Sequence, residues 1–87
     1  MPTLQREYWD GSPVAIGPGF RLRLERGDKA HEAECVLLTH QLGFELRLNI
    51  NGELRRSRVC RSTDEVLTTT EGWRAALRDK GWKDAQP

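Results

Sequence analysis

The sequence predicts an α+β domain, a four-stranded antiparallel meander with one C-terminal helix packed on one face. Three observations predict this class. Residues 20–25 and 44–50 alternate apolar and polar side chains, which is the period of half-buried strands. Asn51-Gly52 follows the second of these segments, and this dipeptide is the strongest short hairpin signal. A capping-box sequence at 62–65 then opens an amphipathic helix. Because the connections are short, neighbouring strands are expected to pair antiparallel.

The first half of the chain supplies two strands. In residues 20–25 the alternation places the apolar residues inward and Arg21 and Arg23 outward. Gly27-Asp28 marks a turn. Residues 33–40 are apolar on both parities, which is typical of a central strand covered on both faces. These two segments therefore form a predicted first hairpin.

The second hairpin has two registers that the sequence leaves open. A two-residue loop at Asn51-Gly52 pairs Phe44 with Val59 and sets Arg47 opposite Arg56. A three-residue loop pairs Phe44 with Cys60 instead. A slip of one residue moves every side chain of a strand to the other face. The register therefore decides which arginines share a face.

The predicted helix has recognisable ends. Ser62 is the expected N-cap, with Glu65 three residues later completing a capping box. Gly81 is placed to end the helix in the left-handed conformation, with Trp82 folding back onto Leu77. The predicted core-facing stripe between these ends consists of Val66, Thr70, Trp73, Leu77 and the stem of Lys80.

The chain of 87 residues makes one domain, because chains usually divide only beyond about 250 residues. Residues 20–82 are expected to form this single β-β-β-β-α domain. Residues 1–19 hold three of the four prolines and are predicted to be irregular apart from a short extended piece at residues 14–16, folding back on the domain with Trp9 as an anchor. Residues 83–87 are predicted to fray.

The sequence favours neither an enzyme nor a metal protein. Two histidines and two cysteines match the ligand count of a zinc site, but their spacing does not fit paired zinc knuckles. These residues are His31, Cys35, His40 and Cys60. Glycine-rich cofactor motifs are missing from the sequence. No catalytic residue, metal site or cofactor is therefore expected, and the two cysteines are interpreted as small buried hydrophobes.

Arginine is the most informative residue type. The formal net charge is only +1, from 14 basic and 13 acidic residues, yet eleven of the basic residues are arginine. Guanidinium groups suit the recognition of phosphates and carboxylates. The outward face of the sheet is predicted to carry the candidate binding residues, which are Arg21, Arg23, Arg47, Arg56 and Arg58. In the register of the three-residue loop, Arg55 and Arg61 take the places of Arg56 and Arg58 on this face.

These observations lead to one functional hypothesis and one alternative. The hypothesis is a small non-enzymatic binding module that contacts a protein partner, or a second copy, through a sheet edge or the arginine-rich face. The alternative is a nucleic-acid-binding domain that contacts phosphates through that face. No membrane contact is expected, because the longest aliphatic run covers only residues 36–38, and a cytoplasmic location is the expectation.

Overall fold

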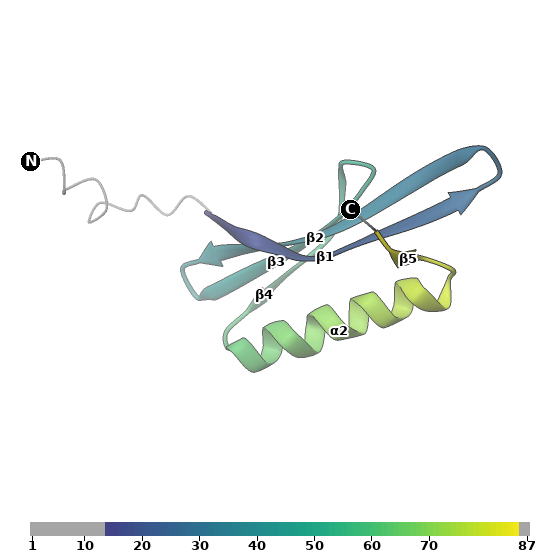
Figure 1. Ribbon diagram of the computed structural model, residues 1–87. Helices are drawn as coiled ribbons and strands as arrows, with labels where there is room; N and C mark the ends of the chain where they lie inside the picture. Colours follow the sequence, from purple (N-terminus) through teal and green to yellow (C-terminus); the bar gives the residue numbers. More distant parts are fainter. Residues whose placement is uncertain (1–13, 86–87) are drawn as a thin grey trace, which may run out of the picture.

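The computed structural model describes residues 14–85, which form one antiparallel sheet and one helix (Figure 1). The five strands stand in the order β4-β3-β2-β1-β5. The elements are β1 (Ala15–Arg26), β2 (Lys29–His40), β3 (Gly43–Ile50), β4 (Glu53–Cys60), α2 (Thr63–Asp79) and β5 (Lys83–Asp84). The predicted class, an α+β domain with an antiparallel sheet and one helix, is confirmed.

The predicted strand count of four is wrong, because the chain after the helix adds a fifth strand. Lys83 and Asp84 pair with Arg23 and Leu22 of β1. The predicted frayed segment 83–87 therefore starts with two residues that belong to the sheet. Strand β1 begins at Ala15, so the extended piece expected at residues 14–16 is the start of a strand that continues through residues 17–19, a segment predicted to be irregular. The predicted fold-back of residues 1–19 on Trp9 concerns residues outside the described part of the chain.

The core lies between α2 and the facing side of the sheet. The side chains of Leu22, Cys35, Leu46 and Cys60 are fully buried, one from each long strand. Val66, Trp73 and Leu77 of α2 pack against this cluster, as the helical stripe predicted. Thr69 is the buried threonine, and the predicted Thr70 is only half-buried. The alternation of β1 is confirmed, because its inward residues Phe20 and Leu22 belong to the core.

Both helix ends follow the capping signals. The Ser62 hydroxyl accepts a hydrogen bond from the Glu65 amide at 3.1 Å. The Glu65 carboxylate in turn accepts from the Arg61 amide at 2.7 Å, one residue before the cap. At the other end Gly81 adopts φ 101°, and the amides of Gly81 and Trp82 donate to the carbonyls of Arg78 and Leu77. These two hydrogen bonds are those of a Schellman motif, so the predicted C-terminal end of the helix is confirmed.

The second hairpin combines parts of both predicted registers. The loop has two residues, Asn51 and Gly52, and Ile50 pairs with Glu53. A bulge then inserts Arg55, after which Leu48 pairs with Arg56. The remaining pairs follow the register that the three-residue loop predicted, ending with Phe44 opposite Cys60. Arg47 lies opposite Ser57, so the Arg47–Arg56 pair that the two-residue-loop register predicted does not form.

The tip of this hairpin is anchored on β2. The Asn51 amide donates to the Glu32 carbonyl at 2.8 Å, and the Glu32 amide donates to the Asn51 side-chain oxygen at 3.0 Å. His31 Nδ1 lies 3.0 Å from the Asn51 side-chain nitrogen. The turn residue thus satisfies backbone groups of β2 beyond the regular β2–β3 ladder, which fixes the tip in space.

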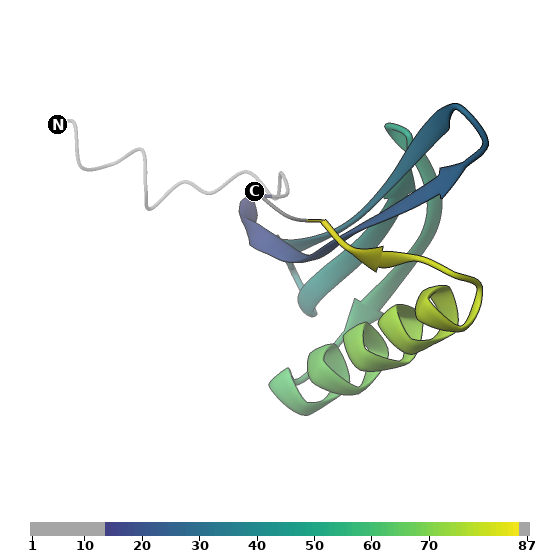
Figure 2. The ribbon, with the colours of Figure 1, turned by 45° about the vertical axis from the view of Figure 1, so that its right-hand side comes forward.

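The helix crosses one face of the sheet, from the β4 edge where it begins to the β1–β5 edge where it ends (Figure 2). No helix covers the opposite face within residues 14–85. The helix in this described range is not long and apolar enough to cross a membrane. The two ends of the helix thus lie beside different edges of the sheet, β4 at its start and β1–β5 at its end.

Candidate functional site

The structure separates the five candidate arginines onto two faces. Arg21, Arg23 and Arg47 alternate with inward residues of β1 and β3, and lie on the face away from α2, as predicted. Arg56 and Arg58 lie directly opposite the core residues Leu48 and Leu46, and therefore point to the helix side. The bulge at Arg55 is the cause, because one extra residue reverses the side on which later residues of a strand point. The prediction that these five arginines share one face, which followed from the two-residue-loop register, is wrong.

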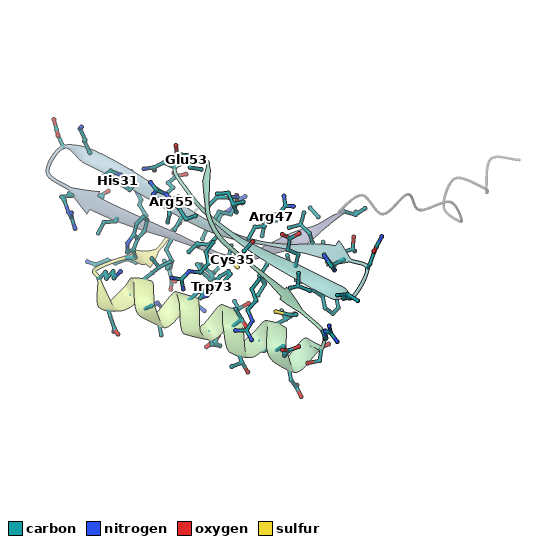
Figure 3. All side chains as sticks on the ribbon, turned by 180° about the vertical axis from the view of Figure 1, so that it is seen from behind. His31, Cys35, Arg47, Glu53, Arg55 and Trp73 are labelled. Atoms are coloured by element: carbon teal, nitrogen blue, oxygen red, sulfur yellow. The ribbon has the colours of Figure 1, made fainter. Side chains whose placement is uncertain are left out.

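Each arginine of the outer face has a carboxylate partner. Arg21 pairs with Glu34 of the neighbouring strand at 3.0 Å, whereas the other two pairs join residues two apart on one strand. These are Arg23 with Glu25 at 3.4 Å and Arg47 with Glu45 at 3.2 Å. Exposed pairs of this kind contribute about 0–1 kcal/mol to stability. These carboxylates do, however, neutralise the positive charge of the three arginines, which is the charge that would attract a phosphate to this face. Figure 3 shows Arg47 on the side of the sheet away from α2.

The two candidate arginines of β4, Arg56 and Arg58, are held less firmly. The Arg56 guanidinium carbon lies 6.0 Å from the centre of the Trp73 ring, the outer limit of a cation–π contact. Among residues 14–85, Arg56 forms no ion pair with a carboxylate. Arg58 reaches Glu65 of α2 at 3.9 Å, the longest ion pair in the described chain. Both guanidinium groups therefore remain available to a stronger partner.

A groove of about 380 Å³ runs between β4 and the first half of α2. Arg58 lines it from the strand. One side of the helix lines it at positions about four residues apart, namely Asp64, Glu65, Thr68, Thr69, Gly72 and Trp73. Trp73 rises from α2 toward the sheet, as Figure 3 shows, and is half-buried. The groove thus has one aromatic side chain and several small ones beside an edge strand.

Gly72 is unusual within this helix. Glycine in a helix interior is about 1 kcal/mol less favourable than alanine. A methyl group added at Gly72 would meet no atom within 4 Å, so packing of the described chain does not require a glycine here. The absence of a side chain keeps the middle of the groove open. The sequence at this point, Thr68-Thr69-Thr70-Glu71-Gly72, has a low helix propensity, which marks this part of the helix as locally weak. The sequence does not show that Gly72 lies beside a groove.

Within residues 14–85, strand β4 is an edge of the sheet, and it lies beside this groove. Residues 53–59 are all exposed, and in this described range β4 pairs with β3 alone. Alternate residues of an edge strand point their amide and carbonyl groups away from the sheet, where another chain can pair with them. Backbone pairing at β4, with side chains entering the groove, is what this arrangement can do chemically.

The histidines and cysteines form no comparable site. His31 contacts Asn51, and His40 Nδ1 accepts a hydrogen bond from the Leu42 amide at 3.0 Å. Cys35 and Cys60 are free and fully buried. Burial, with a smaller effect of Cys60, raises the pKa of the Cys35 thiol to about 11, which disfavours the nucleophilic thiolate. Across residues 14–85, no three His, Cys, Asp or Glu side chains are grouped to hold a metal ion.

Comparison with known proteins gives no relative from which a function could be transferred, because no family model, curated protein or solved structure matches this chain. The geometry of the β4 edge and its groove is therefore the basis for the functional argument.

Proposed function

We propose that this chain is a small non-enzymatic binding module that recruits an extended segment of a partner protein as an additional strand on β4. The observation that carries the proposal is an edge strand whose outer side pairs with no strand of residues 14–85, together with an open groove beside it. In this mode of recognition, main-chain hydrogen bonds supply affinity and alternate side chains supply specificity. The groove would receive the side chains on the helix side of the added strand.

A foreign partner fits this edge better than a second copy. Two β4 strands pairing antiparallel about Ser57 would set Arg56 of one copy opposite Arg58 of the other. Like charges directly opposite each other destabilise a sheet. The bulge at Arg55 further interrupts the ladder, a device that limits edge-to-edge association. We therefore include a monomeric state in the proposal.

A reducing location, the cytoplasm, belongs to the same proposal. Both thiols are free, and they are buried inside the described domain. Disulfides are rare in reducing compartments, where buried cysteines serve as small apolar side chains. Fractionation of cells that express the full chain tests this part directly, and recovery in an oxidising compartment would contradict it.

A displayed library of random eight-residue peptides, the length of β4, tests the binding mode. Selection uses the full chain, and a Gly72→Gln variant serves as the blocked form. This variant should fold at least as well as the wild type, because glutamine is the better helix former and meets no atom near its Cβ. We expect peptides that bind the wild type, lose affinity for Gly72→Gln and shift the amide NMR signals of residues 53–60.

The matched control is Leu67→Gln, which places the same side chain about 140° around the helix from Gly72. It should bind the selected peptides as the wild type does. An unsuccessful selection, or binders that ignore Gly72→Gln and shift other amides, would overturn the proposal. In parallel, fluorescence anisotropy with duplex DNA and an RNA hairpin covers the alternative. Tight, salt-sensitive binding lost in an Arg56→Gln/Arg58→Gln double variant would replace the protein partner by a nucleic acid.

A further inference from the structure

We propose that the segment recruited on β4 is acidic, with carboxylates at alternate positions that face Arg56 and Arg58. This inference rests on the proposed function and specifies its partner. Arg56 and Arg58 stand two residues apart on the same face of an edge strand. Their Cα atoms are therefore about 7 Å apart, the spacing of alternate residues in any strand laid beside them. A partner strand thus presents its own residues i and i+2 to the two guanidinium groups.

The charge along this edge is unbalanced. The segment from Glu53 to Arg61 holds four arginines and one glutamate. That glutamate pairs with Arg55 at 3.3 Å, which leaves Arg58, in the lining of the groove, and Arg56, beside Trp73, as the remaining cations of β4 on the helix side. An added strand with opposite charges at the facing positions is stabilised by direct cross-strand pairs.

The acids of the helix do not restore the balance. One carboxylate oxygen of Glu65 accepts from the Arg61 amide at 2.7 Å, and only the other reaches Arg58, at 3.9 Å. Asp64 lies in the first turn of α2, where a negative charge is stabilised by the helix dipole. Glu65 therefore completes the capping box first, and its hold on Arg58 is loose. A carboxylate from a partner strand competes with a long ion pair, not a short one.

The remaining contact of Arg56 is compatible with such a partner. A guanidinium group stacked on an indole still presents its N–H groups at its edges, where a carboxylate binds. Trp73 lies on the helix side of Arg56 at the outer limit of a cation–π contact, so this contact leaves the N–H groups of the cation open to a partner. The open space at Gly72 leaves room for the side chain that the added strand places between β4 and α2.

The probes are three eight-residue peptides in which threonine alternates with glutamate, glutamine or lysine. Each is labelled and titrated into the full chain at low salt and at about 0.15 M salt. The glutamate peptide is expected to bind about tenfold more tightly than the glutamine peptide at low salt, with the lysine peptide weakest. The difference should shrink as salt rises, because charge pairs at an exposed edge are screened.

The Arg56→Gln/Arg58→Gln double variant should reduce the glutamate-to-glutamine affinity ratio to about one. The matched control is Arg21→Gln/Arg23→Gln on the opposite face, which should keep the preference for glutamate. Equal binding of the glutamate and glutamine peptides, both lost with Gly72→Gln, would overturn the acidic partner and leave the strand-addition function standing. Loss of the preference in the control double variant would also overturn it, because it would place the recognition on the other face. If no peptide shifts the β4 amides, the inference falls, and the library selection decides separately whether the function does.

Discussion

The two edges of the sheet are finished in different ways. At the β1 edge, the chain after the helix returns as β5, and the Ala85 amide adds a hydrogen bond to the Arg21 carbonyl at 3.1 Å. Asp84 then receives hydrogen bonds from Arg74 and Arg78 of α2 at 3.0 Å and 2.6 Å. At the β4 edge the described chain provides no further strand, and only charged side chains and a bulge stand against unwanted pairing.

This difference indicates how a very small domain divides its structural tasks. The β1–β5 edge joins the last strand, the last turns of the helix and the core residue Trp82, so it belongs to the folding unit. The β4 edge contributes mainly Cys60 to the core and leaves the rest of its strand in solvent. Changes at the closed edge should therefore alter stability, whereas changes at the open edge should mainly alter recognition.

The largest expected effect is at the closed edge, in Trp82→Ala. Trp82 is 8% exposed and belongs to the core cluster beside Leu77. Removing such a buried aromatic side chain costs about 3–5 kcal/mol of unfolding free energy. Denaturant unfolding followed by circular dichroism measures the loss. A loss below about 1 kcal/mol would show that the closed edge contributes little to stability, which would contradict the difference described between the two edges.

A smaller loss is expected for Ser62→Ala, at the helix start beside the open edge. The Ser62 hydroxyl is the acceptor for the Glu65 amide, and losing an N-cap of this kind costs about 0.5–2 kcal/mol. Ser62→Asp should retain most of the stability, because aspartate is also a favoured cap. Unchanged melting of Ser62→Ala would mean that packing alone holds the first turn.

A gain in stability is expected for Gly72→Ala in the groove. The added methyl meets no atom within 4 Å, so the helix gains roughly 0.8–1 kcal/mol from the better propensity of alanine. Thermal melting of the full chain measures this gain. A loss of stability would show that the fold requires Gly72. The open edge would then differ less from the closed edge than described above.

The smallest effect concerns pH at the closed edge. Hydrogen bonds from Arg78 and then Arg74 lower the pKa of Asp84 below its ordinary value. A carboxyl group with a lowered pKa in the folded state stabilises the protein above its unfolded pKa of about 4, and this contribution disappears as the pH falls through the folded pKa. Asp84→Asn should therefore flatten the acid side of the stability profile. Arg74→Gln/Arg78→Gln should flatten it equally, and an unchanged profile in both would contradict the role of Asp84.

Most of the fold could be predicted because local signals agreed with the tertiary structure. The alternation in β1 and β3, the turn at Asn51-Gly52 and both helix caps depend on residues close together in the sequence. Strand β5 could not be predicted, because two polar residues carry no periodicity. Its pairing arises only once Gly81 and Trp82 have reversed the chain beside β1.

The candidate site could be predicted only in part. The sequence identified the arginines and an edge strand as features of interest, but not which side of the sheet each side chain occupies. The inserted residue Arg55 decides that, and the sequence of this mostly polar, exposed strand does not show where an extra residue is inserted. The groove also depends on Gly72 and Trp73 standing beside β4, which follows from how the helix crosses the sheet.

The bulge at Arg55 also sets the reach of any ligand. On the two sides of this bulge, the outward-pointing N–H and C=O groups of β4 follow different registers. A straight partner strand can therefore pair with only one of the two stretches. The stretch from Arg56 to Cys60 is the longer of the two with regular pairing, about 16 Å of ladder at 3.3 Å per residue. A recognised sequence of about five residues, short enough to lie inside a loop or tail, is therefore the natural match for this edge.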